Sequence, residues 1–591
     1  MPKTDIAVRE LIDKVSHGEL LLPEMQRRYV WPATRVRDLL DSLYRGYPSG
    51  TILVWETDQE IETKSLAVKA TKTPTSSNRL LLLDGQQRIT SLAAILEGQP
   101  VQVRGRKRPI EILFNLEHPE GPPVEVLEVD ENNTLTELDD DDDEEDEYDI
   151  QEELRSRTFV VASRALEANP VWVPVSTIFA KSDSEILRRF KISPDDSRWD
   201  KYSERLQRVR KIRDYPYVMQ VLEKKLSYEE VTEIFVRVNS LGIKLRGSDL
   251  ALAQISSQWN GFLRLCEHFA GDFEDDENFL LESGLLVRLL VVFATEQSRF
   301  KTVGRIGRAK LEGAWVDAKE GLEFAINFVK SNARIESLSL LSSPFLLIPI
   351  AVYGHLKKMK LTETEDKALL RWFYLAHMHG HYSRGSSETI LDGDLGILFR
   401  TKSLENLLKQ LQQHVKQFEV MYADVEHRGI RNPLFSMLYF VLRLNGAKDW
   451  LSGLKLSSKH VGKAHKLQFH HIFPKSLLKK AGSERNEINE IANMAFIGGK
   501  ANRHILNNPP SKYFPEDIIK TRGKDALTSQ LVPVEQKLWR MENYQEFLDY
   551  RRKAIVSAIN EFIATLEQHS PRQRLTRRAS LTDVGDFPCV A

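Results

Sequence analysis

Cysteine is nearly absent from this chain of 591 residues, because only Cys266 and Cys589 occur. This scarcity excludes a disulfide scaffold and any zinc or redox site built on paired cysteines, and it suits a reducing compartment. Long apolar runs are missing too, since no stretch reaches the roughly 18 apolar residues that a membrane-spanning helix needs. The first residues lack the apolar core of a signal peptide. We therefore expect a soluble, cytoplasmic protein that does not contact a membrane.

An overall charge of one sign is also lacking, because 83 Lys and Arg stand against 84 Asp and Glu. The balance hides residues 125–153, which hold 17 acidic residues and no basic one. Such dense like charges repel one another, so we expect a flexible loop. A second interpretation is that this segment competes for a basic surface that binds nucleic acid. Residues 455–512 indicate such a surface, with 11 Lys or Arg against 3 Asp or Glu.

The hydrophobic pattern predicts a mixture of strands and helices in the first part of the chain. One helical face is marked by Val36, Leu39, Leu40 and Leu43, and residues 51–55 have the composition of a strand. The apolar residues 80–83 are followed by Asp-Gly and then by a helical pattern, which predicts a strand–turn–helix junction.

At about 150 residues per domain, the length indicates several domains. We expect an α+β multidomain protein in which a mixed N-terminal domain precedes a mostly α-helical middle and a helical C-terminal domain. The predicted parts are residues 1–250, 251–445, 446–568 and a disordered basic tail at 569–591.

The predicted turn after the second strand suits the binding of a phosphate group. Its candidate residues are Asp84, Gly85, Gln86, Gln87, Arg88 and Thr90. Gly85 permits a tight turn, and the helix that follows offers backbone N–H groups and the positive end of its dipole to an anion. Arg88 adds a fork of donors, Thr90 a hydroxyl, and Asp84 either a metal ligand or a partner for an arginine. The plainer alternative is that Asp84 caps the helix and that the other side chains are ordinary surface residues.

Two further segments accompany this turn, PEMQRRYVW at residues 23–31 and IFVRVNSLGIKL at residues 234–245. Together with DGQQR they resemble the signature of the GmrS-type, ParB-like nucleotide-binding module of GmrSD-type modification-dependent (type IV) restriction systems. The resemblance implies a ParB/sulfiredoxin-like fold that binds and hydrolyses a nucleoside triphosphate. It implies catalytic roles for Asp84 and Arg88. The nucleotide-binding residues that it implies are Gln26, Arg27, Gly85, Gln86, Gln87, Thr90, Arg237 and Asn239.

A pair of histidines, His470 and His471, marks the segment LQFHHIFP. One neutral imidazole can bind a divalent cation while the other removes a proton from water, and phosphodiester hydrolysis needs both tasks. Asn502 can offer an oxygen to the metal, and Asn493 can brace a loop that aims the base. For each residue taken alone, a structural hydrogen bond or a turn is the plainer interpretation.

The joint pattern resembles the ββα-metal (HNH) finger of the GmrD type. The resemblance implies that His471 is the general base, that Asn493 orients it, and that His470 and Asn502 are metal ligands. Many such fingers have Asp where His470 stands. Because imidazole is a softer ligand than carboxylate, nickel and zinc become candidates beside magnesium and manganese.

The sequence thus predicts an NTP-regulated HNH endonuclease of bacterial anti-phage defence, which cleaves or nicks modified or otherwise marked DNA with a divalent metal. Its expected partners are DNA and a nucleoside triphosphate, and a homodimer is left open. Two alternatives remain: a nucleotide-sensing DNA-binding regulator that does not cleave, and an RNA-cleaving toxin. Metal-dependent scission of DNA, of RNA or of neither separates the three.

Overall fold

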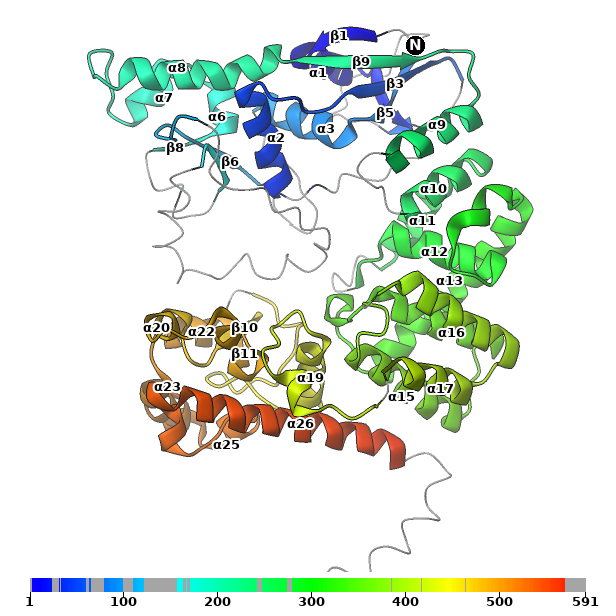
Figure 1. Cartoon of the computed structure of the whole chain (residues 1–591), viewed down its shortest axis with the longest axis vertical. Helices are drawn as coiled ribbons and strands as arrows, with labels where there is room; N and C mark the ends of the chain where they lie inside the picture. The colour runs from blue at the N-terminus through cyan, green and yellow to red at the C-terminus, as the bar shows by residue number, and fades with distance from the viewer. Residues whose placement is uncertain are drawn as a thin grey trace, which may run out of the picture. The chain divides into compact units, whose positions relative to one another are not determined.

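A computed structural model describes 14 stretches of the chain. They are residues 3–23, 31, 33–59, 63–64, 79–98, 110–121, 157–162, 166, 171–241, 247–273, 279–383, 385–415, 417–462 and 464–568. The acidic segment 125–153, predicted to be a flexible loop, and the basic tail 569–591, predicted to be disordered, lie outside these stretches. The chain divides into two compact units, Met1–Cys266 and Glu267–Ala591 (Figure 1).

A six-stranded mixed sheet forms the centre of the N-terminal unit. Its strands are β1 (Lys3–Ala7), β2 (Leu20–Pro23), β3 (Ile52–Thr57), β4 (Thr63–Lys64), β5 (Arg79–Asp84) and β9 (Pro216–Leu222). Their order across the sheet is β1-β9-β3-β5-β2-β4. The pairs β9–β3 and β5–β2 are parallel and the others are antiparallel.

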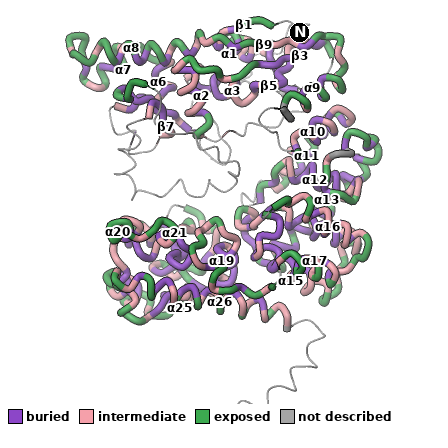
Figure 2. Tube along the Cα trace, viewed as in Figure 1, coloured by how far each residue is buried: buried purple, intermediate pink, exposed green. Residues whose placement is uncertain are grey.

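Helices cover both faces of this sheet. They are α1 (Val8–Ser16), α2 (Ala33–Arg45), α3 (Gln86–Leu96), α9 (Tyr228–Leu241) and α10 (Gly247–Gln258). Leu82 of β5 packs into a core with residues of α1, α2 and α3, whereas its neighbours Leu81 and Leu83 pack with residues of α9 and α10. Because both faces are buried, residues 52–55 of β3 and 80–83 of β5 are all apolar, and Figure 2 shows these strands among buried segments.

A smaller antiparallel sheet and short helices complete the N-terminal unit. The sheet has the order β7-β6-β8, and a later helix, α11, ends at Gly271. The elements are β6 (Ile112–Asn115), β7 (Phe159–Val161), β8 (Trp172–Pro174), α6 (Val175–Ala180), α7 (Asp183–Arg189), α8 (Trp199–Arg210), η2 (Lys211–Asp214) and α11 (Phe262–Gly271).

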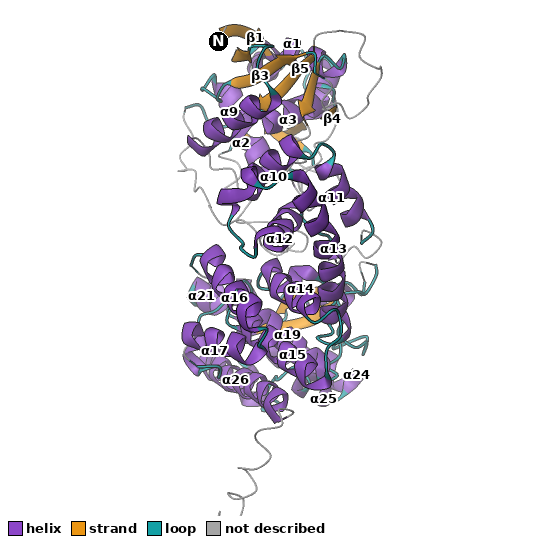
Figure 3. Cartoon of the chain, turned by 90° about the vertical axis from the view of Figure 1, so that its right-hand side faces the viewer, coloured by secondary structure: helices purple, strands orange, loops and turns teal. Residues whose placement is uncertain are grey.

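The first part of the C-terminal unit is helical, as predicted for the middle of the chain (Figure 3). Its elements are α12 (Ser283–Thr295), η4 (Phe300–Arg305), α13 (Arg308–Ser331), η5 (Leu338–Leu340), η6 (Pro344–Leu346), α14 (Leu347–Leu356), α15 (Glu363–Met378), α16 (Ser387–Thr401), α17 (Leu404–Val415), α18 (Tyr422–Val425) and α19 (Pro433–Leu444). In the described part of the chain, no helix has both the length and the apolar character to span a bilayer.

The rest of the C-terminal unit contains a two-stranded antiparallel sheet, β10 (Leu467–His471) with β11 (Met494–Gly498), followed directly by α22 (Gly499–Ile505). Leu467 pairs with Gly498 and His471 with Met494, so the two strands and the helix form a ββα unit. The surrounding elements are α20 (Lys475–Lys480), α21 (Arg485–Ile488), η7 (Ile491–Asn493), α23 (Pro510–Tyr513), η8 (Phe514–Ile519), α24 (Lys520–Arg522), α25 (Asp525–Thr528), η9 (Gln536–Trp539), η10 (Met541–Asn543) and α26 (Tyr544–Gln568).

Candidate functional site

Arg88 braces the turn that follows β5. Its Nη2 donates to Asp84 Oδ2 at 3.1 Å and to the Thr51 carbonyl at 2.7 Å, and its Nη1 donates to the Ser49 carbonyl at 2.6 Å. The guanidinium carbon lies 5.7 Å from the centre of the Tyr217 ring. The Arg88 guanidinium thus donates to groups of the protein itself, and both of its terminal nitrogens are used in these bonds. Of the two roles considered for Asp84, pairing with an arginine is the one that the contacts display.

Two glycines make room for this brace. Gly85 has a φ of +102°, and a Cβ there would lie 2.5 Å from Ile52 Cδ1. Gly50 has a φ of +94°, and a Cβ there would collide with the Arg88 guanidinium. Only glycine meets both the conformational and the steric demand at these positions. The sequence analysis identified Gly85 but missed Gly50, although Pro48-Ser49-Gly50 is a turn signal before a strand.

The first turns of α3 connect the DGQQR segment with the segment that ends at Trp31. The Trp31 backbone N–H donates to Gln87 Oε1 at 3.1 Å, and the Gln87 carbonyl accepts a bond from the Ser91 hydroxyl at 2.7 Å. Gln86, Gln87 and Thr90 are half-buried. Gln26 and Arg27, both predicted to bind nucleotide, lie outside the described residues.

Residues 234–241 of the third motif segment lie on α9, on the other face of the sheet from α3, and residues 242–245 lie outside the described part. Phe235 is buried in the core between this helix and the sheet, while Arg237 is exposed and pairs with Glu233 one turn away. The backbone of Asn239 is helical, and its side chain lies outside the described part. The structure thus joins the first two motif segments, and it assigns the third to a helix that buries Phe235.

In the C-terminal unit, the ββα fold brings His470 and Asn502 together. His470 Nδ1 lies 2.7 Å from Asn502 Oδ1. His470 is buried, with the Trp450 and Tyr513 rings edge-on at 6.0 and 5.9 Å. Burial lowers the pKa of His470 to about 4, so the ring is neutral at neutral pH, as a metal ligand must be. Its Nε2 is buried without a hydrogen-bond partner among the described residues.

His471 is the neighbouring residue on β10, and its side chain is partly exposed. Its Nε2 lies 3.1 Å from Asn489 Oδ1. Burial of the ring and the nearby Lys475 ammonium lower the pKa of His471, while the bond to Asn489 acts in the opposite sense. At neutral pH the ring is therefore neutral, and one of its two nitrogens has a lone pair.

Asn493 contacts the backbone next to His471 and is fully buried. Its Oδ1 accepts from the Phe473 N–H at 2.9 Å, and its Nδ2 donates to the carbonyls of Phe473 at 3.1 Å and Ile488 at 3.0 Å. Its own carbonyl accepts from the Ile472 N–H at 2.8 Å. Asn493 thus fixes the path of the chain just after β10, and it does so through the backbone.

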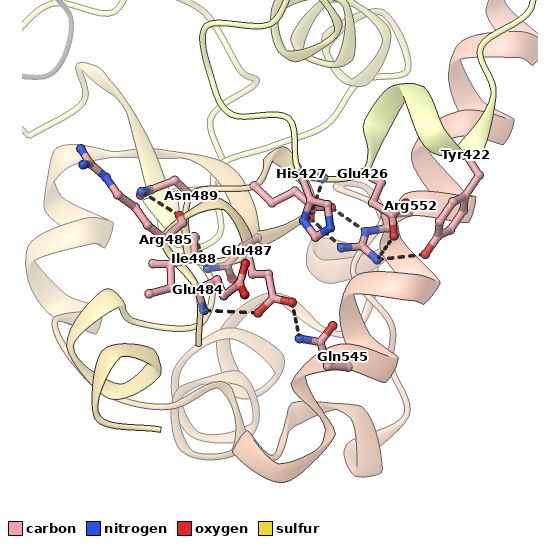
Figure 4. Close-up of polar contacts among 12 residues, drawn as sticks. Tyr422, Glu426, His427, Glu484, Arg485, Glu487, Ile488, Asn489, Gln545 and Arg552 are labelled. Carbon is pink, nitrogen blue, oxygen red and sulfur yellow. Dashed lines mark hydrogen bonds and ion pairs between the residues drawn. The ribbon is translucent and has the colours of Figure 1, made fainter. Parts of the chain in front are cut away.

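Asn489 is a site residue that sequence reasoning missed. It lies 18 residues after His471, in a run of alternating Asn and Glu that has no obvious strand or helix pattern. Figure 4 shows Asn489 at the end of α21, beside the polar contacts that involve Glu487 and Arg552. Only the fold shows that this amide faces the His471 ring.

The two predicted metal ligands of the ββα unit come from β10 and α22. Within the described residues, no group of three or more His, Cys, Asp and Glu side chains could hold a metal ion. The donors at this site are one imidazole and one carboxamide, from His470 and Asn502, and they face each other at hydrogen-bond distance. The buried Nε2 of His470 adds a nitrogen that the described protein does not satisfy.

Comparisons with known proteins identify a relationship for the N-terminal part. Residues 8–256 match the family model of the GmrSD restriction endonuclease, N-terminal domain. The matched range contains the three N-terminal motif segments and ends before the ββα unit. An uncharacterized protein of Methanocaldococcus jannaschii is 24% identical over 621 residues, which cover 94% of this chain and 98% of that protein. The similarity to this relative therefore continues through the C-terminal unit.

Proposed function

We propose, starting from the restriction-endonuclease match of the N-terminal part, that this protein is an NTP-regulated DNA endonuclease of anti-phage defence. It cleaves or nicks modified or otherwise marked DNA by metal-dependent hydrolysis of a phosphodiester. One observation carries the nuclease proposal: the ββα unit brings His470 within 2.7 Å of Asn502 and presents His471 beside them on the same strand.

In this mechanism the two histidines have separate tasks. His470 and Asn502 would hold a divalent cation, which when bound would supply positive charge for the scissile phosphate and the leaving oxygen. His471 accepts the proton of the attacking water at a ring nitrogen. Asn493 keeps the backbone after β10 in place through its two bonds to Phe473, so that the base stays aimed.

The proposed triphosphate site is the turn between β5 and α3. A phosphate would bind at the start of α3, just after Gly85, where the helix dipole favours negative charge. Arg88 and Asp84 stabilise the turn from the side of Ser49 and Thr51. Gln86, Gln87 and Thr90, together with Gln26 and Arg27, complete the proposed nucleotide-binding set at this turn. Arg237 and Asn239, which the resemblance also assigned to the set, lie on α9 on the other face of the sheet. Hydrolysis there would regulate the nuclease.

The decisive experiment compares the unchanged protein with His471→Ala on plasmid DNA, phage DNA and total RNA. We expect metal-dependent cleavage of DNA by the unchanged protein, a loss on the order of 100-fold or more in His471→Ala, and retained triphosphate hydrolysis. Chelation of the metal should stop cleavage and leave DNA binding intact. A variant that still cuts DNA would refute the base assignment. Cleavage of RNA alone would favour a toxin, and binding without scission would favour a regulator.

A further inference from the structure

We propose that Asn489 is a positioning residue for His471, and that the buried pair Glu490–Arg552 fixes the segment of Asn489 against α26. This inference rests on the proposed nuclease function and identifies what controls the alignment of its base. The contacts that carry it come from α18, α21 and α26, all within the C-terminal unit (Figure 4).

The orientation of the Asn489 amide is determined by its second contact. Its Nδ2 donates to the Arg485 carbonyl at 3.1 Å, so the atom that faces His471 Nε2 at 3.1 Å is the amide oxygen. Because that oxygen can only accept, Nε2 of the neutral His471 ring must carry the hydrogen. The other ring nitrogen, Nδ1, then has the lone pair. Asn489 thus selects which nitrogen of His471 is able to take a proton from water.

The next residue, Glu490, is fully buried and forms a two-point ion pair. Arg552 Nε donates to its Oε1 at 2.6 Å and Arg552 Nη2 to its Oε2 at 2.7 Å. The His427 backbone N–H also donates to Oε2, at 3.0 Å. A buried carboxylate is tolerated only with such partners, and loss of one partner leaves an uncompensated charge. The position of Glu490, and with it that of Asn489, is therefore set by Arg552.

Helix α26 holds the same segment at a second point. The Tyr544 hydroxyl donates to the Glu487 carbonyl at 2.7 Å, and Gln545 Nε2 donates to the Glu487 side chain at 3.0 Å. Arg552 Nη1 in addition donates to the Tyr422 hydroxyl at 3.0 Å, so α18 is part of the same network. A displacement of α26 relative to the ββα unit would therefore move Asn489 and misalign His471. This is a physical route by which the helical region can regulate cleavage.

The test compares five variants with the unchanged protein: Asn489→Ala, Asn489→Asp, Glu490→Gln, Arg552→Lys and the control Glu546→Gln. The control makes the same chemical change as Glu490→Gln at an exposed residue of α26 that pairs with Lys537 at 2.9 Å. For each protein, the single-turnover cleavage rate and the DNA Kd are measured with manganese and supercoiled plasmid or phage DNA. The temperature lies below the unfolding transition of every variant, which circular dichroism verifies.

We expect Asn489→Ala to lower the cleavage rate about 10–100-fold with the DNA Kd changed less than about twofold. Asn489→Asp retains an acceptor for the Nε2 hydrogen and should recover much of that loss. Glu490→Gln and Arg552→Lys should reduce the rate in the same sense, and Glu546→Gln should not. If Glu490→Gln does not fold, Arg552→Lys and the two Asn489 variants still decide the question.

Three outcomes would overturn the proposal. Normal cleavage by Asn489→Ala, while His471→Ala is inactive, would remove the positioning role and leave the nuclease function standing. Equal losses in Asn489→Ala and Asn489→Asp, with a parallel loss of DNA affinity, would assign Asn489 a packing role only. If the unchanged protein does not cut, the nuclease function itself fails, and this inference fails with it. If His471→Ala cuts as well as the unchanged protein, the nuclease function stands, but the base assignment fails and this inference fails with it.

Discussion

Single residues decide the geometry of the turn after β5. Gly85 combines a left-handed φ of +102° with the Ile52 methyl group only 2.5 Å from where a Cβ would lie. Gly46 has a φ of +73° and nothing within 4 Å of that point. A side chain at Gly46 would therefore introduce backbone strain alone, whereas a side chain at Gly85 would introduce both backbone strain and steric overlap.

We expect Gly85→Ala to lower the free energy of unfolding of the N-terminal unit by about 3 kcal/mol, since left-handed strain and overpacking both contribute. Gly46→Ala carries the strain alone and should cost about 1 kcal/mol. Urea unfolding followed by circular dichroism gives both values. Equal losses in the two variants would show that Ile52 yields to the added methyl group at no cost.

At the scale of elements, α15 contains a buried histidine, His377, that contacts the segment of Ser342 and helix α19. His377 is fully buried, its Nδ1 accepts from the Ser342 N–H at 3.1 Å, and its Nε2 lies 3.3 Å from the Ser436 hydroxyl of α19. Burial lowers the pKa of His377 to about 3. Below about pH 6.5, His377 therefore binds a proton in the unfolded chain but not in the folded chain.

Because the unfolded state gains this proton, stability falls as the pH drops below about 6.5. His377 alone should account for a loss of about 2 kcal/mol between pH 7 and pH 5. In His377→Asn, whose amide can accept the Ser342 bond, the C-terminal unit should be less stable at pH 7 but lose less on acidification. Urea unfolding at both pH values measures the difference. An equal loss in variant and unchanged protein would contradict the assignment.

The elements were predictable where a local pattern specifies them. The helical face at Val36 became α2, and the apolar residues 80–83 became the centre of β5. Within the predicted helical middle, Ser343-Pro344 begins a 3-10 turn before α14.

Long-range partners were not predictable from the sequence. Arg88 bonds to carbonyls 37 and 39 residues earlier, and Glu490 pairs with an arginine 62 residues later. No periodicity carries such information, because tertiary packing alone determines these distances. The sequence therefore indicated which residue types form the candidate site, whereas the fold revealed which side chains hold them.

At the scale of the whole molecule, the two candidate sites belong to different compact units. Asp84 and Arg88 lie in residues 1–266, and His471 lies in residues 267–591. Apart from α11, which crosses the boundary at Cys266, each element belongs to one unit, so we expect a substitution in one site to leave the other site folded.

We expect Arg88→Ala to lower triphosphate hydrolysis on the order of 100-fold, because the turn loses its ties to Asp84, Ser49 and Thr51. Arg198→Ala removes an exposed ion pair with Asp196 in the same unit and should hydrolyse normally. Phosphate release assays on both variants, with thermal unfolding as a check of folding, give the comparison. Normal turnover in Arg88→Ala would remove the claim for this site.

The pairing of β10 with β11 determines which kinds of mutation should damage the site most. Adjacent residues of a strand point to opposite faces. His470 and His471 therefore have different surroundings only because they occupy alternate positions of β10. Deletion of one codon for an earlier residue of β10 would turn each of the two imidazoles to the face that the other now occupies, although both histidines would remain. Point substitutions leave that parity intact, so small deletions here should be the harsher class of genetic lesion.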